Sequence, residues 1–81
     1  MIPHTNKIIR LPAVQEALAV GRTSIYQALG EGLITKPIKV SARLNAWPES
    51  EIEAIKSARI AGQSNEQIKS LVIELQTRRG R

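Results

Sequence analysis

The residues with the clearest capacity for intermolecular contacts lie together between positions 22 and 27 of the 81-residue chain. Their side chains carry a guanidinium, hydroxyls and an amide: Arg22, Thr23, Ser24, Tyr26 and Gln27. Such groups donate hydrogen bonds to phosphate oxygens and to base edges in the major groove of DNA. Because residues 17–30 include no carboxylate, the stretch predicts a surface that contacts a polyanion. A solvated helix face is the alternative, and Tyr26 could equally pack half against the core.

The spacing of apolar residues predicts that residues 22–29 form a helix. Ile25 and Leu29 are four positions apart, so they would share one apolar face and leave the polar side chains on the other. Gly21 is an acceptable N-cap, and the glycines at positions 30 and 32 are suited to end the helix. A short helix with this polar face is what reading of the major groove requires.

A first helix is predicted immediately before, from Pro12 to about Ala19. Proline is suited to the first helical position, which needs no amide donor. The residues expected to face the core are Ala13, Val14, Ala17 and Leu18. Two short helices joined by a tight turn at Val20 and Gly21 match the helix-turn-helix pattern, with residues 22–29 as the recognition helix.

Residues 36–46 predict a basic β-hairpin, or wing, directly after the helix pair. Ile38 and Val40 would lie on one face and Lys39 on the other, and alternation resumes at residues 44–47 after a loop at 41–43. Pro37 belongs at the start of a strand because it cannot donate to the ladder. The candidate contacts to a DNA backbone or minor groove are Lys36, Lys39, Ser41 and Arg43.

The C-terminal part predicts two more helices, separated by a break at residues 61–63. Both starts have capping-box spacing, Ser50 with Glu53 and Ser64 with Gln67. The expected core positions are Trp47, Ile52, Ile55 and Ala58, followed by Ile68, Leu71, Val72 and Leu75. The arginines at the C-terminal end, residues 78, 79 and 81, are expected to be solvated.

Charge and composition narrow the function classes. The net charge is +5, and residues 1–48, with six basic and two acidic side chains, carry +4 of it. This excess favours a phosphate-binding surface. The chain has no cysteine, and its single histidine, His4, has no partner ligand, so no metal or other cofactor is expected. No set of catalytic side chains can be assembled, so an enzyme is not predicted.

The ordered set of motifs resembles the AlpA family of phage and genomic-island regulators, which is related to small excisionases and to the DNA-binding part of MerR-type proteins. The resemblance covers about residues 8–60 and rests on RTSIY at 22–26, KPIKV at 36–40 and ESEI at 49–52, with Gly32 and Trp47. Gly21, in place of a serine, and Ile34-Thr35, in place of a Phe-Pro pair, depart from the family pattern. The resemblance implies a winged helix-turn-helix that regulates a promoter and, in some relatives, helps an integrase to excise a mobile element.

Together these observations predict a mainly α fold with a small β-hairpin: a flexible tail at 1–7, a winged helix-turn-helix domain at 8–62, and a C-terminal helix with a basic tail at 63–81 packed on the same domain. The predicted function is sequence-specific binding of double-stranded DNA by a cytoplasmic phage or mobile-element regulator or excision factor. An integrase, a recombinase or RNA polymerase is the implied protein partner, and no membrane is involved because no apolar run approaches the roughly 20 residues of a bilayer span. We expect a monomer in solution that self-associates, if at all, on DNA. The alternative is an adaptor that docks a partner through the apolar stripe of helix 64–77.

Overall fold

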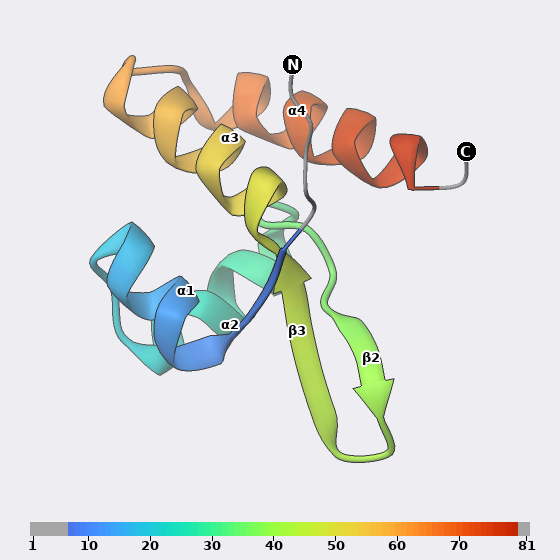
Figure 1. Ribbon diagram of the computed structural model, residues 1–81. Helices are drawn as coiled ribbons and strands as arrows, with labels where there is room; N and C mark the ends of the chain where they lie inside the picture. The colour runs from blue at the N-terminus through green and yellow to red at the C-terminus, as the bar shows by residue number, and fades with distance from the viewer. Residues whose placement is uncertain (1–6, 80–81) are drawn as a thin grey trace.

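The computed structural model describes residues 7–79 of the chain. In chain order these residues form β1 (Ile8–Arg10), α1 (Leu11–Leu18), α2 (Arg22–Glu31), β2 (Ile38–Ser41), β3 (Leu44–Pro48), α3 (Glu49–Ile60) and α4 (Asn65–Arg78) (Figure 1). The predicted class, mainly α with a small β-hairpin and an additional C-terminal helix, is confirmed. His4, Arg81 and all but the last residue of the predicted tail lie outside the described residues. None of the described helices is both long and apolar enough to cross a bilayer.

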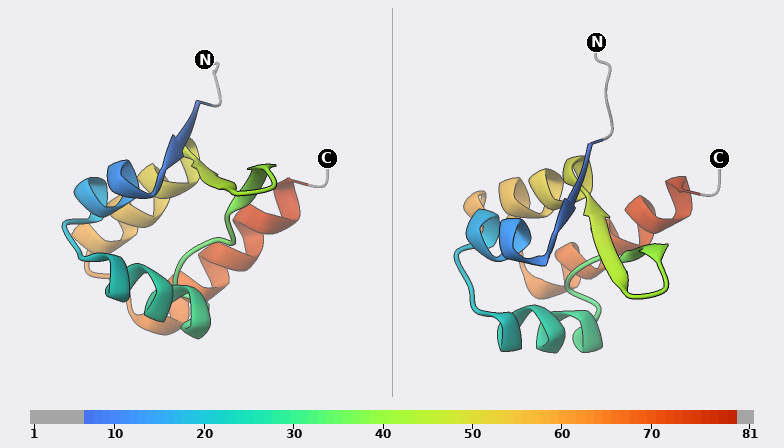
Figure 2. Two further views of the ribbon diagram at one scale, coloured as in Figure 1. Left: turned by 90° about the horizontal axis from the view of Figure 1, so that it is seen from below. Right: turned by 60° about the horizontal axis from the view of Figure 1, so that its bottom comes forward.

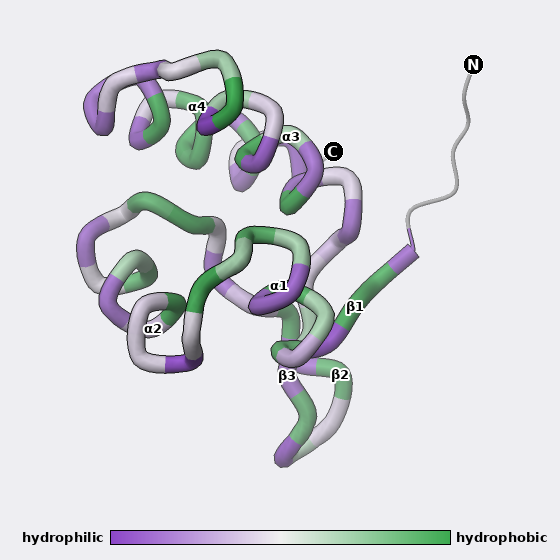
Figure 3. Tube along the Cα trace, turned by 90° about the vertical axis from the view of Figure 1, so that its left-hand side faces the viewer, coloured by the Kyte–Doolittle hydropathy of each residue, from purple (hydrophilic) through white to green (hydrophobic). Residues whose placement is uncertain are grey.

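The helices and the sheet surround one hydrophobic core. In Figure 1, α3 and α4 lie across the top, α1 and α2 lie below them, and the hairpin of β2 and β3 projects downward. Figure 3 shows that the tip of this hairpin is hydrophilic. The core cluster includes side chains from all four helices, from β3 and from residues 33–34. Its most completely buried members are Val14, Ile25, Trp47, Ile52, Ile55 and Ile68.

The helix-turn-helix forms as its pattern predicts, with small shifts at the ends. Gly21 is the N-cap of α2, and Gly32, at φ 76°, is its left-handed C-cap. The helix therefore runs two residues beyond the predicted 22–29. Helix α1 starts at Leu11, one residue before the expected proline, and ends at Leu18, with Ala19 as its left-handed C-cap. The expectation that Ala13 faces the core is wrong, because the helix turns Val14 inward and leaves Ala13 exposed.

The sheet contains the predicted hairpin and a third strand. Strand β3 lies in the middle, with β1 and β2 antiparallel on its two sides. The expected three-residue loop is a two-residue turn, since Ser41 pairs with Leu44. The register shifts between Lys39 and Ser41, which makes Val40 an extra residue on β2. This bulge explains why Val40 is exposed while Ile38 is half-buried, although both were expected on one face.

The starts of α3 and α4 differ. Ser64 forms the predicted capping box: its hydroxyl accepts from the Gln67 amide at 3.2 Å, and its own amide donates to Gln67 Oε1 at 2.8 Å. The capping box predicted at Ser50 is wrong. Helix α3 already begins at Glu49 with Pro48 as its N-cap, so Ser50 lies inside the first turn. The carboxylate of Glu53 instead pairs with Lys56 at 3.0 Å.

The expected aliphatic stripes of both C-terminal helices are buried or half-buried. Ile52, Ile55 and Ala58 of α3 belong to the core cluster. So do Ile68, Val72 and Leu75 of α4, with Leu71 half-buried beside them. The break between the helices also occurs where it was predicted, with Gly62 at φ 81°. The stripe of α4 therefore packs against the rest of the described chain.

The C-terminal end of α4 is joined to α3 and to the segment before the hairpin. Arg79 donates two hydrogen bonds to the carboxylate of Glu51, from Nε at 2.8 Å and from Nη2 at 2.5 Å. Its Nη2 also donates to the carbonyl oxygen of Lys36 at 2.7 Å. Arg79 is exposed as expected, but its side chain is 26% exposed and pairs with a buried carboxylate, so it is not merely solvated. Arg78 is exposed, and within residues 7–79 its ion pair is with Glu74 of its own helix, which agrees with that expectation.

Thr35 combines one satisfied and one unsatisfied polar group in the core. It is fully buried, and its carbonyl oxygen accepts a hydrogen bond from Trp47 Nε1 at 2.8 Å. Its hydroxyl has no hydrogen-bond partner among the described residues. Thr35→Val replaces this hydroxyl with a methyl group of similar size and keeps the backbone carbonyl. We expect an increase of about 1 kcal/mol in the free energy of unfolding, measured by urea denaturation. A decrease would show that the hydroxyl is satisfied in solution.

Candidate nucleic-acid interface

The polar face of α2 is presented to solvent. Arg22, Thr23, Tyr26 and Gln27 are all exposed, whereas Ile25 on the opposite face is buried. The guanidinium carbon of Arg22 lies 5.8 Å from the centre of the Tyr26 ring, at cation–π distance. Tyr26 is 47% exposed, so its ring is available both to Arg22 and to solvent. The pair forms a cationic surface one turn long at the start of the helix.

The N-terminal end of α2 adds to this positive character. Its first turn holds no acidic residue, and Gly21 provides no side chain to accept a hydrogen bond from the free amides. The amides of a first turn and the helix dipole both favour an anion. Arg22 lies in the same turn, so the exposed start of α2 is suited to a phosphate or to the edge of a guanine.

The hairpin presents a second set of polar side chains. Lys39, Ser41 and Arg43 are exposed on β2 and the turn that follows it. Lys36 is exposed just before the hairpin, where its backbone is held at both ends: its amide donates to Gln76 Oε1 at 2.8 Å and its carbonyl accepts from Arg79. The right-hand view of Figure 2 shows α2 and the turn of the hairpin along the same lower edge of the molecule.

The predicted site residues thus form two groups, with one exception. The first group lies on the outer face of α2 and the second on the hairpin and the residue that leads into it. Ser24 lies apart from the first group, since it lines a hollow on the side of α2 that faces α3. Its assignment as a DNA contact, like that of the other eight residues, stays a prediction.

Two supporting residues, Gln76 and Arg79, were not singled out as parts of the site. Neither is a predicted contact residue, but both bind the backbone of Lys36. Gln76 accepts a hydrogen bond from its amide, and Arg79 donates one to its carbonyl oxygen. No sequence pattern identified them, because Arg79 is held by Glu51, whose burial is seen only in the structure. Among residues 7–79, no three acidic or histidine side chains gather in a way that could hold a metal ion.

The helix pair α1–α2 followed by a β-hairpin defines a winged helix-turn-helix protein. Within that class, the chain belongs to the AlpA family: the family model described as prophage CP4-57 regulatory protein (AlpA) matches residues 7–60, more than half of the chain. The resemblance seen in the sequence is thereby confirmed, as is the class of prophage regulatory protein. No curated protein and no solved structure matches the chain.

Proposed function

We propose that the protein binds double-stranded DNA in a sequence-specific way and so regulates transcription from a phage or mobile-element promoter. In this proposal α2 enters the major groove, and the basic wing at residues 36–46 contacts the backbone or minor groove. The observation that carries it is the exposed, carboxylate-free first turn of α2, in which Arg22 lies beside uncapped backbone amides. A role as an excision factor beside an integrase, which the resemblance implies for some relatives, stays a prediction, as does a cytoplasmic location.

The alternative, an adaptor function, depended on the apolar stripe of α4, and most of this stripe is buried. Ile68 is fully buried, and Val72 and Leu75 are 3% and 8% exposed. Leu71 is half-buried, so a partner could reach the whole stripe only if α4 left the core, and the free energy of that step would oppose binding. The membership of a regulatory family also favours DNA over an adaptor role.

The first test is the salt dependence of binding to a duplex taken from the DNA around the protein's own gene. Each phosphate that the protein neutralises is expected to lower log affinity by about 0.9 per log unit of salt. Fluorescence anisotropy of the labelled duplex, measured from low to physiological salt, gives the slope. An affinity that does not change over this range would contradict DNA binding through the basic surfaces.

The second test separates reading of sequence from contact with the backbone. Arg22→Ala should weaken binding to the specific duplex by about 1–3 kcal/mol and relax sequence preference, because a bidentate contact to a base is lost. Lys39→Ala should weaken all duplexes equally and reduce the salt slope by about one phosphate. Both are measured by competition between specific and scrambled duplexes.

The matched control is Arg78→Ala, which removes an exposed arginine that pairs with Glu74 on α4. It lowers the net charge as much as Arg22→Ala does, so it corrects for the long-range effect of charge. If Arg22→Ala behaved like Arg78→Ala in both affinity and sequence preference, α2 would not be the recognition helix.

A further inference from the structure

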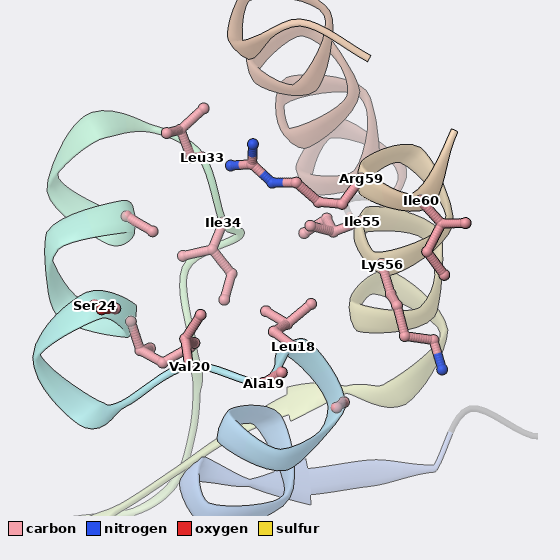
Figure 4. Close-up of a pocket in the computed structure, with 13 residues that line it drawn as sticks. Leu18, Ala19, Val20, Ser24, Leu33, Ile34, Ile55, Lys56, Arg59 and Ile60 are labelled. Carbon is pink, nitrogen blue, oxygen red and sulfur yellow. The ribbon is translucent and has the colours of Figure 1, made fainter. Parts of the chain in front are cut away.

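An apolar groove of about 510 Å³ runs between the α1–α2 turn and the C-terminal half of α3. Figure 4 shows side chains from both sides of the groove, with α2 and residues 33–34 on one side and α3 on the other. Ile25, Ile34 and Ile55 are at most 2% exposed and close its floor. The groove is therefore a surface feature above an intact core, not a defect within it.

Two apolar side chains in the walls of this groove are exposed to solvent. Val20, in the turn between α1 and α2, is 39% exposed, and Ile60, at the end of α3, is 79% exposed. Leu18 is half-buried between them. A connected apolar surface with a polar rim is typical of a site that receives the apolar face of a helix.

The rim of the groove is positively charged. Lys56 and Arg59 line it, and of the described residues that line it none is acidic. Figure 4 shows Arg59 extending from α3 toward Leu33. The hydrogen bond from Arg59 to the side-chain oxygen of Asn65 leaves its charge in place because that acceptor is neutral. Lys56 pairs with Glu53, but this pair is exposed and therefore weak.

We propose that this groove docks an acidic amphipathic helix of a partner protein. The apolar face of such a helix would cover Leu18, Val20 and Ile60, and its carboxylates would meet Lys56 and Arg59. A second copy of this chain is disfavoured as the occupant because its net charge of +5 would oppose the basic rim. Of the residues predicted to contact DNA, Ser24 lines the groove, whereas Arg22, Thr23, Tyr26 and Gln27 do not. A partner in the groove would therefore leave the Arg22 and Tyr26 face of α2 open to DNA, an inference that goes beyond the proposed function.

The test uses the full chain and two synthetic peptides of about 14 residues, roughly four helical turns. Both carry leucine at helical spacing; the other positions are mostly glutamate in one peptide and mostly lysine in the second. We expect fluorescence anisotropy to show binding of the acidic peptide and none of the basic one. Val20→Ser and Arg59→Gln should each weaken this binding about tenfold, the effect of losing one central contact.

Matched controls lie outside the groove. Val40→Ser changes a valine of similar exposure on the hairpin, and Arg78→Gln changes an exposed arginine on α4, outside both the groove and the proposed DNA-binding surface. Both should leave binding of the acidic peptide unchanged, and thermal melting should confirm that all four variants are folded. No binding of the acidic peptide, equal binding of the basic one, or equal losses in groove and control variants would overturn the proposal. A DNA-free dimer of the wild type that Val20→Ser dissociates would overturn it too, since the occupant would then be a second copy.

Discussion

Trp47→Ala is expected to reduce the free energy of unfolding by about 3–5 kcal/mol. Trp47 is 1% exposed and is the largest fully buried side chain of the core. It belongs to β3, and its indole N–H is bonded to the carbonyl of Thr35. Alanine would leave a large cavity and an unpaired carbonyl at the junction of the hairpin and the helices. Total stabilities of about 5–15 kcal/mol are typical of folded domains, so the variant should be partly unfolded at ordinary temperatures.

Urea denaturation followed by far-ultraviolet circular dichroism measures this loss without relying on the tryptophan as a fluorophore. Tyr26→Ala is the matched control because it removes the other aromatic residue of the chain, which is 47% exposed. It should change stability little while altering DNA binding. Trp47→Phe keeps most of the apolar volume but loses the hydrogen bond. The difference in stability between the Phe and Ala variants therefore measures packing, and the difference between the wild type and the Phe variant measures mainly the hydrogen bond. A Trp47→Ala midpoint equal to that of the wild type would contradict burial of the ring.

Arg79→Ala should have the second largest effect, a loss of about 3 kcal/mol. The carboxylate of Glu51 is buried, with 7% of its side chain exposed, and Arg79 supplies hydrogen bonds to both of its oxygens. Removal of the guanidinium would leave that carboxylate buried and unpaired, which costs more than the ion pair itself contributes. The carbonyl of Lys36 would lose a donor at the same time. Thermal and urea denaturation should both show the loss.

A second substitution tests the cause of this effect. Glu51→Gln in the Arg79→Ala background replaces the stranded charge with a neutral amide, so it should restore part of the lost stability. Arg78→Ala, at the neighbouring exposed position, should cost little because its pair with Glu74 is accessible to solvent. If Arg78→Ala and Arg79→Ala destabilised the protein equally, the contact with Glu51 would not be important in solution.

Most elements of the fold could be predicted because periodicity and capping are local. The four helices follow from apolar spacing and from residues such as Gly21, Gly32 and Ser64, whose effects depend on a few neighbours. Two errors are local, the burial of Ala13 and the capping box at Ser50, and the others concern interactions between distant segments. Strand β1 has no local signal of this kind, since it exists through pairing with Trp47 and its neighbours.

In the candidate site, too, local features could be predicted and contacts between distant segments could not. The exposed face of α2 was predictable because Ile25 fixes which side of the helix is buried. The bulge at Val40 was not, because it depends on the register between two strands. The role of Arg79 was not predictable either: its partner Glu51 lies 28 positions away, and nothing in the sequence marks that glutamate as buried.

The direct passage from β1 into α1 has a consequence for the spacing of any DNA site. Strand β1 ends at Arg10, α1 begins at Leu11, and β1 pairs with β3, the inner strand of the hairpin. The helix pair is therefore joined to the base of the wing through the β1–β3 ladder as well as through residues 32–37, and this second connection limits rotation between them. If α2 and the wing contact DNA as proposed, each inserted base pair between their two contacts would rotate one away from the other by about a tenth of a turn. Operators of this protein should tolerate base changes between the two contacts far better than a change in length.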